Sequence, residues 1–256
     1  MVSALSGQMP AQLLDRVVQS SYDRQFAAYQ KQPLVARSAT YFRENIGKVE
    51  SVDALLDDYR LKTDLLEAFG LEELGNSRAL IKRILADDLT SEDALVYRMN
   101  DPRFVQMATT LQLDTGTDRL KDPALVESIV ARQQTNGFEK QVGEQSLAVR
   151  QAMYFRRNAG TGKIENMYQI LGDKVLRDVA LKAAGLPKEV ANVPLEKQAA
   201  MLAKQLDLTK LDDPAYMERF IQKYLTKEDM ANSDGGAGIL SLFQPLGASG
   251  GINFLV

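Results

Sequence analysis

The 256-residue sequence contains no histidine, no cysteine and no tryptophan. Without histidine or cysteine the chain can build no Ser-His-Asp or Cys-His nucleophilic site, zinc finger, cysteine-ligated iron–sulfur cluster or disulfide framework. Because no imidazole titrates near neutral pH, acid–base chemistry would need a shifted carboxylate, lysine or tyrosine. The sequence also has no excess of positive charge, because it contains 31 Lys and Arg residues and 34 Asp and Glu residues. The sequence therefore does not predict nucleic acid as a partner.

Targeting patterns are also missing from the sequence. The first residues lack the basic region and the apolar run of a Sec signal peptide. No stretch reaches the roughly 18 uncharged apolar residues that span a bilayer. We therefore expect a cytoplasmic protein with no membrane span, while association with a flagellum or export without a Sec signal stays open. Hydrophobic residues make up 45% of the chain and charged residues 25%, which predicts a globular core.

Apolar residues recur every three or four positions along most of the chain, which is the pattern of amphipathic helices. They form one stripe over residues 13–29 and another over residues 52–69. Ser51 is placed to cap the start of the second stretch, and Gly70 to end it. The sequence lacks the alternating pattern of half-buried strands. We predict an all-α fold with about a dozen helices.

Two kinds of cap mark further helix starts. Asp101, Asp122 and Asp213 each precede a proline, and this pair combines an N-cap acceptor with a residue that needs no N–H at the first helical position. Thr90 and Thr226 are each followed by an aspartate three positions later, which resembles a capping box. We expect a helix to begin at each of these five positions.

The chain repeats itself. Residues 37–47 have the pattern Arg-x-Ala-x-Tyr-Phe-Arg-x-Asn-x-Gly, and the same pattern recurs 113 positions later. Weaker matches extend in both directions, which predicts an internally duplicated multi-helix bundle with a Gly-rich C-terminal tail. The predicted domains are a first helical repeat with its N-terminal helix at 1–118, a second repeat packed on the first at 119–231, and the apolar tail at 232–256.

This repeated core is the sharpest feature of the sequence. Its phenylalanines step with neighbouring apolar residues by three and four, which favours packing in a seam between helices. Its arginines and asparagines can bind carboxylates or the free carbonyls of a helix end, and one aspartate retained in each copy is a candidate partner. We interpret the core as packing with an Arg–Asp tether rather than as an anion-binding site. Its residues are Arg37, Tyr41, Phe42, Arg43, Asn45 and Asp58 in one copy, and Arg150, Tyr154, Phe155, Arg156, Asn158 and Asp173 in the other.

Two other patterns resemble sites but favour structural roles. Residues 160–163, Gly-Thr-Gly-Lys, resemble the end of a phosphate loop, but its first glycine, its Ser or Thr and its preceding strand are missing. Aspartate doublets at 57–58, 87–88 and 212–213 do not bring two carboxylates together, because adjacent helical residues point about 100° apart. We predict no catalytic residue, no metal ligand and no cofactor.

The C-terminal tail differs from the rest of the chain. From residue 235 onward lie six of the 17 glycines, a density that disfavours regular structure. Apolar residues interrupt the glycines, so the tail either packs against the bundle or binds a partner and becomes ordered. The candidate docking residues are Ile239, Leu240, Leu242, Phe243 and Phe254.

The sequence also resembles a known family, which suggests a function. The stretch Tyr-Phe-Arg-Glu-Asn-Ile-Gly-Lys-Val-Glu-Ser-Val at 41–52 is followed by Asp-Tyr-Arg-Leu at 58–61 and Ala-Phe-Gly-Leu at 68–71. With Ile-Lys-Arg-Ile-Leu at 81–85 and Asp-Pro-Arg-Phe at 101–104, this pattern resembles a bacterial family known only as domain of unknown function 1217, found mainly in alphaproteobacteria. Members are commonly encoded among flagellar genes, so the resemblance implies a flagellum-associated, non-enzymatic protein. It implies no catalytic residues.

We therefore predict a non-enzymatic structural or interaction protein, associated with flagellar assembly or motility and binding a protein partner, with flagellar components as candidates. A homo-oligomer is compatible with the sequence. The alternative is a small-ligand sensor or binding module with a pocket between the two helical copies, lined by Arg43, Arg156 and tyrosine. An enzyme would need a buried carboxylate pair or a shifted lysine, which sequence alone does not reveal.

Overall fold

The structure is a computed structural model that describes residues 9–99, 101–160 and 164–234. Within these ranges every regular element is a helix, so the expected all-α fold is confirmed. Residues 235–256 of the predicted tail, which include all five candidate docking residues, lie outside the described residues, whereas residues 232–234 belong to the last helix of the described chain.

Fourteen α-helices and six short 3-10 helices make up the described chain. The α-helices that precede the long central one are α1 (Ala11–Ser20), α2 (Tyr22–Gln30), α3 (Pro33–Asn45), α4 (Val52–Asp57), α5 (Tyr59–Phe69), α6 (Arg78–Leu85), α7 (Leu95–Arg98) and α8 (Pro102–Leu111). The central helix and those that follow are α9 (Pro123–Gln145), α10 (Leu147–Ala159), α11 (Met167–Gly172), α12 (Lys174–Ala183), α13 (Leu195–Leu202) and α14 (Pro214–Asp234).

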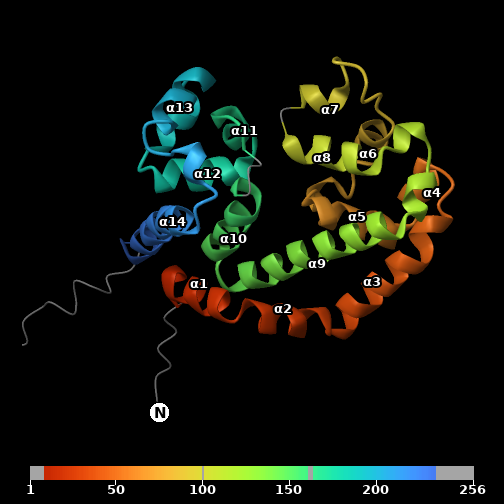
Figure 1. Cartoon of the computed structure of the whole chain (residues 1–256), viewed down its shortest axis with the longest axis horizontal. Helices are drawn as coiled ribbons and strands as arrows, with labels where there is room; N and C mark the ends of the chain where they lie inside the picture. The colour runs from red at the N-terminus through yellow and green to blue at the C-terminus, as the bar shows by residue number, and fades with distance from the viewer. Residues whose placement is uncertain (1–8, 100, 161–163, 235–256) are drawn as a thin grey trace, which may run out of the picture.

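The buried side chains form two clusters, which we call the first and second lobes. The first lobe takes its core from residues 39–130, so it includes the N-terminal half of α9. The second lobe takes its core from residues 138–225 and from residues 11–29 at the start of the chain. Figure 1 shows α9 running from one lobe to the other, with α1 beside α10 and α14. The predicted boundary between residues 118 and 119 therefore does not coincide with the division of the core.

Side-chain caps mark the starts of several helices. The three Asp-Pro starts are confirmed, because Asp101, Asp122 and Asp213 each accept a hydrogen bond from a backbone N–H of the helix that follows. The Ser51 hydroxyl caps α4, and Gly70 ends α5 in the left-handed region at φ 66°. The expected single helix over residues 52–69 is wrong, however. It divides at Asp58, whose carboxylate caps α5.

The two Thr capping boxes are also wrong. Thr226 lies inside α14, and its hydroxyl donates to the Gln222 carbonyl one turn earlier. No helix begins at Thr90, which bonds the Asp88 carboxylate in a turn. The aspartate of the second box has another use, because Asp229 accepts hydrogen bonds from the first backbone N–H groups of α1. A capping pattern needs an interruption in the preceding helix, and α14 has none.

The stripe expected over residues 13–29 is interrupted as well. The chain bends at Ser21, between α1 and α2, where φ is −129°. Leu14 and Val18 of α1 are buried against the second lobe, whereas Leu13 and Val17 of the same stripe are exposed. A single face of α1 therefore enters the core.

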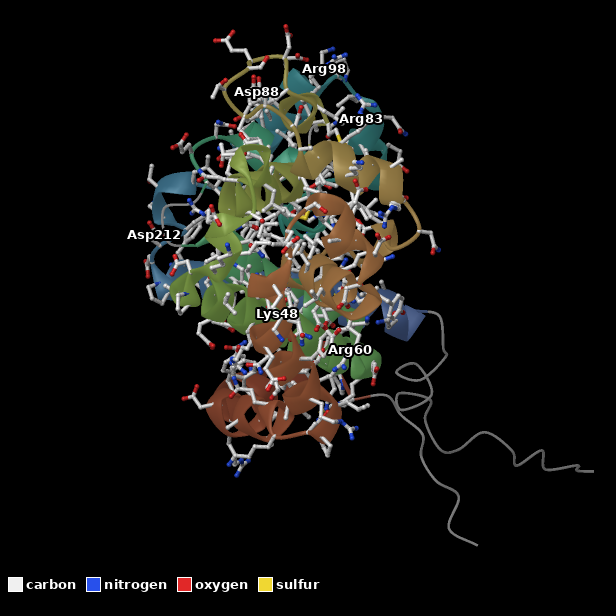
Figure 2. The ribbon with its side chains drawn as sticks, turned by 90° about the vertical axis from the view of Figure 1, so that its right-hand side faces the viewer. Lys48, Arg60, Arg83, Asp88, Arg98 and Asp212 are labelled. Carbon is white, nitrogen blue, oxygen red and sulfur yellow. The ribbon has the colours of Figure 1, made fainter. Side chains whose placement is uncertain are left out.

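Charged side chains of both signs cover the outside of the molecule. Figure 2 shows Arg83, Asp88 and Arg98 toward one end, with Lys48 and Arg60 nearer the other. None of the described helices combines the length and the apolar character needed to cross a membrane.

Candidate functional site

The repeated core forms matching hydrogen bonds in the two halves of the chain. The Tyr41 hydroxyl donates to Asp58 Oδ2 at 2.6 Å, and the Tyr154 hydroxyl donates to Asp173 Oδ2 at 2.6 Å. The other oxygen of each aspartate accepts two backbone N–H groups at the start of the next long helix, α5 or α12. Each aspartate therefore caps a helix and holds a tyrosine at the same time.

The arginines bind carboxylates as expected, but the candidate partners Asp58 and Asp173 are wrong, because these two aspartates bind the tyrosines and backbone amides instead. Arg43 instead makes two hydrogen bonds to Glu127 of α9, at 2.6 and 2.8 Å. Arg156 makes two to Asp15 of α1, both at 2.8 Å, and a third to Glu218 of α14. Each arginine thus binds the first helix of the other half of the chain. These are two-bond pairs of the strong, geometry-specific kind.

The other core residues support the packing interpretation. Phe42 and Phe155 are completely buried between helices, as expected. Asn45 Nδ2 donates to the Tyr41 carbonyl at 2.8 Å, and Asn158 Nδ2 donates to the Tyr154 carbonyl at 2.9 Å. These asparagines satisfy helix carbonyls one turn earlier, close to the expected role at a helix end.

The two lobes face each other across a cleft made of three adjoining cavities. The first, of about 250 Å³, lies over the middle of α9 and is lined by Arg103, Arg150 and Tyr154 among others. The second, of about 230 Å³, shares Arg103 and Tyr154 with the first. The third, of about 430 Å³, shares Pro102 and Gln169 with the second. We call this continuous feature the inter-lobe cleft and take it as the candidate site.

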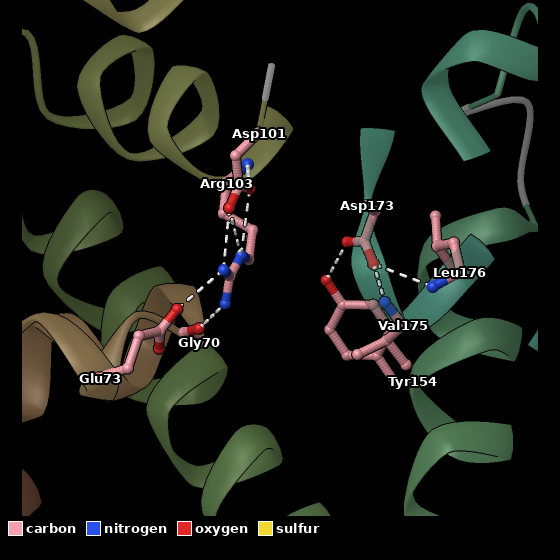
Figure 3. A network of polar contacts seen from close by, with 8 residues as sticks. All are labelled: Gly70, Glu73, Asp101, Arg103, Tyr154, Asp173, Val175 and Leu176. Atoms are coloured by element: carbon pink, nitrogen blue, oxygen red, sulfur yellow. Dashed lines mark hydrogen bonds and ion pairs between the residues drawn. The ribbon is translucent and has the colours of Figure 1, made fainter. Parts of the chain in front are cut away.

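Arg103 of α8 dominates the first-lobe wall of the cleft (Figure 3). Its guanidinium donates to Asp101 Oδ2 at 2.8 Å, to Glu73 Oε1 at 2.8 Å and to the Gly70 carbonyl. Burial lowers the pKa of Arg103, but its bonds to Asp101 and the charge of Glu73 outweigh burial and raise that pKa. Asp101 thereby links the cap of α8 to the wall of the cleft. We did not predict Arg103 as a site residue, because its partners are set by tertiary structure.

Tyr154 stands on the opposite wall, which the second lobe provides (Figure 3). Burial raises the pKa of its phenol, and the neighbouring Asp173 charge and the hydrogen bond to it raise that pKa further. The phenol therefore keeps its proton at neutral pH and acts as a hydrogen-bond donor to Asp173. Arg150, from the same repeat core, also lines this part of the cleft, whereas its counterpart Arg37 is exposed on α3.

The floor of the cleft is a polar segment of α9. Asn136 Nδ2 donates to the Glu67 and Ala68 carbonyls near the end of α5, at 2.7 and 3.0 Å. Arg157 of α10 donates to Asn136 Oδ1 at 2.6 Å and to Glu139 Oε1 at 2.7 Å. This network ties α5 of the first lobe to α10 of the second through α9. The sequence signal that could have identified this network is the group of side-chain amides that interrupts the apolar pattern of the long helix α9.

The lining of the far end of the cleft is mainly apolar, although Asp101 and Arg177 also contribute to it. Tyr97 of α7, Tyr168 of α11 and Leu195 of α13 line its third cavity and are 43%, 48% and 45% exposed. Both lobes contribute to this group, because α7 belongs to the first lobe and α11 and α13 to the second. Large apolar side chains that gather around a hollow are typical of a binding surface.

The alternative prediction, a pocket between the two copies, named lining residues that differ from those in the structure. A cleft does lie between the lobes, and Tyr154 lines it. Arg43 and Arg156 are not among its lining residues, since they bind Glu127 and Asp15. Within the described residues, no group of three or more aspartates and glutamates is placed to hold a metal ion.

The fold and this cleft define a class of protein, a two-lobed all-α bundle bridged by one long helix. Residues 68–217 match the family model described as protein of unknown function (DUF1217), and the chain belongs to this family. The chain is similar to protein AGR_C_984 from Agrobacterium tumefaciens, known from its X-ray crystal structure. The two are 25% identical with a TM-score of 0.78, and the alignment covers 91% of this chain and 99% of that one. No curated protein matched the sequence.

Proposed function

We propose that this protein is a non-enzymatic interaction protein that binds a protein partner in the apolar end of the inter-lobe cleft. The observation that carries the proposal is the exposure of Tyr97, Tyr168 and Leu195 around one cavity. Tyrosine is enriched where proteins bind each other, since it combines a large apolar area with a polar group.

The charged groups of the repeat core support the same proposal. Arg43 and Arg156 are engaged in pairs that hold helices together, and Tyr41 and Tyr154 are bonded to aspartates that cap helices. Their polar atoms therefore contribute to architecture. The flagellar part of the proposal, a role in assembly or motility, rests on the family resemblance of the sequence.

The proposal is tested with a Tyr97→Ser/Tyr168→Ser variant in a flagellated native host. We expect this variant to lose its partner in affinity purification and to reduce swimming in soft agar as strongly as deletion of the gene. Leu34→Ser is the matched control, because Leu34 is 75% exposed on α3 and is absent from the lining of the cleft. Normal swimming of the deletion strain would refute the flagellar role. Unchanged partner recovery with the double variant would refute the cleft as the binding surface.

A second candidate function is supported by the first cavity of the cleft, where two arginines meet a tyrosine. The cavity of about 250 Å³ lined by Arg103, Arg150 and Tyr154 has room for a small polar molecule. A ligand sensor would show a ligand-dependent rise in thermal stability that an Arg150→Ala variant loses. If a screen of small anions and polar metabolites raises the thermal stability of neither the parent protein nor the Arg150→Ala variant, this candidate function is refuted.

We also propose that the two halves are duplicated units that have exchanged their first helices. Asp15 of α1 and Glu127 of α9 occupy corresponding places in the sequence repeat, and each binds the repeated arginine of the opposite half. In this interpretation α9 completes the first lobe, and α1 completes the second.

A further inference from the structure

Helix α1 is bound by the second lobe at its start and in its middle. At its start, Asp229 of α14 accepts the Ala11 N–H at 2.6 Å and the Gln12 N–H at 3.2 Å. In its middle, the Asp15 carboxylate is 1% exposed and lies in the two-bond pair with Arg156. Backbone amides at a helix start and a buried carboxylate are specific features, which a chance apolar contact does not provide.

Apolar packing accompanies these polar contacts. Ala11, Leu14 and Val18, on one face of α1, are buried in the core cluster of the second lobe. The receiving surface is a groove between α10 and α14, which supply Arg156 and Asp229. We call it the α1 groove. It recognises a helix by three apolar side chains, one acid and the free amides of the first turn.

The covalent link between α1 and the first lobe is narrow. It consists of α2 and the connection at residues 31–32, which precede Pro33 and α3. In α2, Tyr29 is buried, and Tyr22 and Phe26 pack on Phe138 of α9, so α2 is held by the second lobe as α1 is. Residues 11–30, which we call the N-terminal arm, could therefore leave one second lobe and enter another while all contacts of α1 itself are kept. Exchange of an identical element is a low-cost route to a dimer.

We propose that the α1 groove is an interaction surface for α1 of a second copy of this chain, so that two copies associate by exchanging their N-terminal arms. Each copy then supplies Asp15 and the apolar face of α1 to the second lobe of the other. Within one chain the arm competes at an effective concentration on the order of millimolar for a short linker. The exchanged dimer is therefore favoured at high local concentration, or when the contact within one chain is blocked.

Charge reversal tests the exchange directly in the full chain. One variant carries Asp15→Arg and a second carries Arg156→Asp. Each variant alone places like charges together in its own groove. When the two are unfolded, mixed in equal amounts and refolded, an exchanged heterodimer pairs opposite charges in both grooves. We expect the mixture to move to twice the mass of one chain in light scattering coupled to size exclusion, while each variant alone does not.

Two controls keep the result interpretable. The double variant Asp15→Arg/Arg156→Asp restores the pair within one chain and reports, by circular dichroism, whether the reversed pair permits folding. The matched mixture of Glu127→Arg with Arg43→Glu should stay at the mass of one chain, because α9 lies in the middle of the chain and has no free end to exchange.

Three outcomes would overturn the proposal. A mixture that stays at the mass of one chain while the double variant folds shows that the groove does not accept α1 from a second copy. Equal dimer formation by each variant alone shows that association does not use this pair. If the single variants do not refold, they are co-expressed with different tags, and their failure to co-purify likewise shows that the arms are not exchanged.

Discussion

The Asp15–Arg156 and Glu127–Arg43 pairs have nearly the same chemistry but differ in burial, so a comparison of the two measures the effect of burial on stability. In the second lobe, Asp15 is 1% and Arg156 16% exposed, whereas in the first lobe Glu127 is 58% and Arg43 40% exposed. Both pairs have two hydrogen bonds of 2.6–2.8 Å. We therefore predict very different costs for Asp15→Ala and Glu127→Ala.

Removing one partner of a buried pair leaves an uncompensated buried charge, which typically costs about 3–5 kcal/mol. Arg156 keeps its 2.8 Å bond to Glu218, so we expect Asp15→Ala at the low end, at about 3 kcal/mol. An exposed pair contributes about 0–1 kcal/mol, which bounds the cost of Glu127→Ala. For a chain of this size, about 3 kcal/mol corresponds to a fall in Tm of about 6–12 °C.

Urea unfolding followed by far-UV circular dichroism measures both variants against the parent protein. The comparison requires equal m-values, because a changed m would indicate a change in the unfolding reaction itself. Added salt should weaken only the exposed Glu127 pair, since buried charges are screened less. A difference of less than about 1 kcal/mol between Asp15→Ala and Glu127→Ala would refute the assignment of α1 to a buried site.

Two further predictions concern buried positions. A Cβ added at Gly137 would lie 2.1 Å from the Tyr29 hydroxyl, so Gly137→Ala should destabilise the protein by about 1–3 kcal/mol in urea unfolding, with a partial recovery in a Tyr29→Phe background. A Cβ at Gly143 would approach the Arg150 side chain no closer than 2.7 Å, so Gly143→Ala should cost less, and a loss equal to that of Gly137→Ala would contradict the steric argument. Burial raises the pKa of Asp64, and the hydrogen bond from Ser38 opposes this shift only in part. The stability that the protonated Asp64 side chain contributes is therefore fully present below the unfolded pKa of about 4, and it is lost as pH rises through the folded pKa. Asp64→Asn should therefore raise stability at pH 7 and flatten the pH profile of the urea midpoint above pH 4, and an unchanged profile would count against this assignment.

The fold was predictable wherever a local rule decides it. An aspartate before a proline caps the helix that follows through its own nearest amides, so Asp101, Asp122 and Asp213 were identified correctly. The same local reasoning failed at Thr226, because the pattern of a cap is also compatible with the interior of a long helix. The break at Asp58 was missed because the apolar stripe continues across it.

The site was less predictable, because its partners are far apart in the sequence. The carboxylates that bind the repeated arginines lie 84 positions away for Arg43 and 141 for Arg156. Periodicity shows which face of a helix is apolar, but not which helix covers it. Arg103 illustrates the same limit, since Glu73 and the Gly70 carbonyl reach it only after α5 and α8 have packed. The repeat drew attention to Arg43 and Arg156, and the fold determined their partners.

The bond between Ala11 and Asp229 has a consequence for how the protein is made. These residues are 218 positions apart, so α1 leaves the ribosome long before the residue that caps it. At about 5–20 residues per second, synthesis of the intervening chain takes roughly 10–45 s. During that time the buried face of α1, with Leu14 and Val18, has no lobe to enter, while the first lobe can already form around the start of α9. Helix α1 therefore needs protection from aggregation during that time.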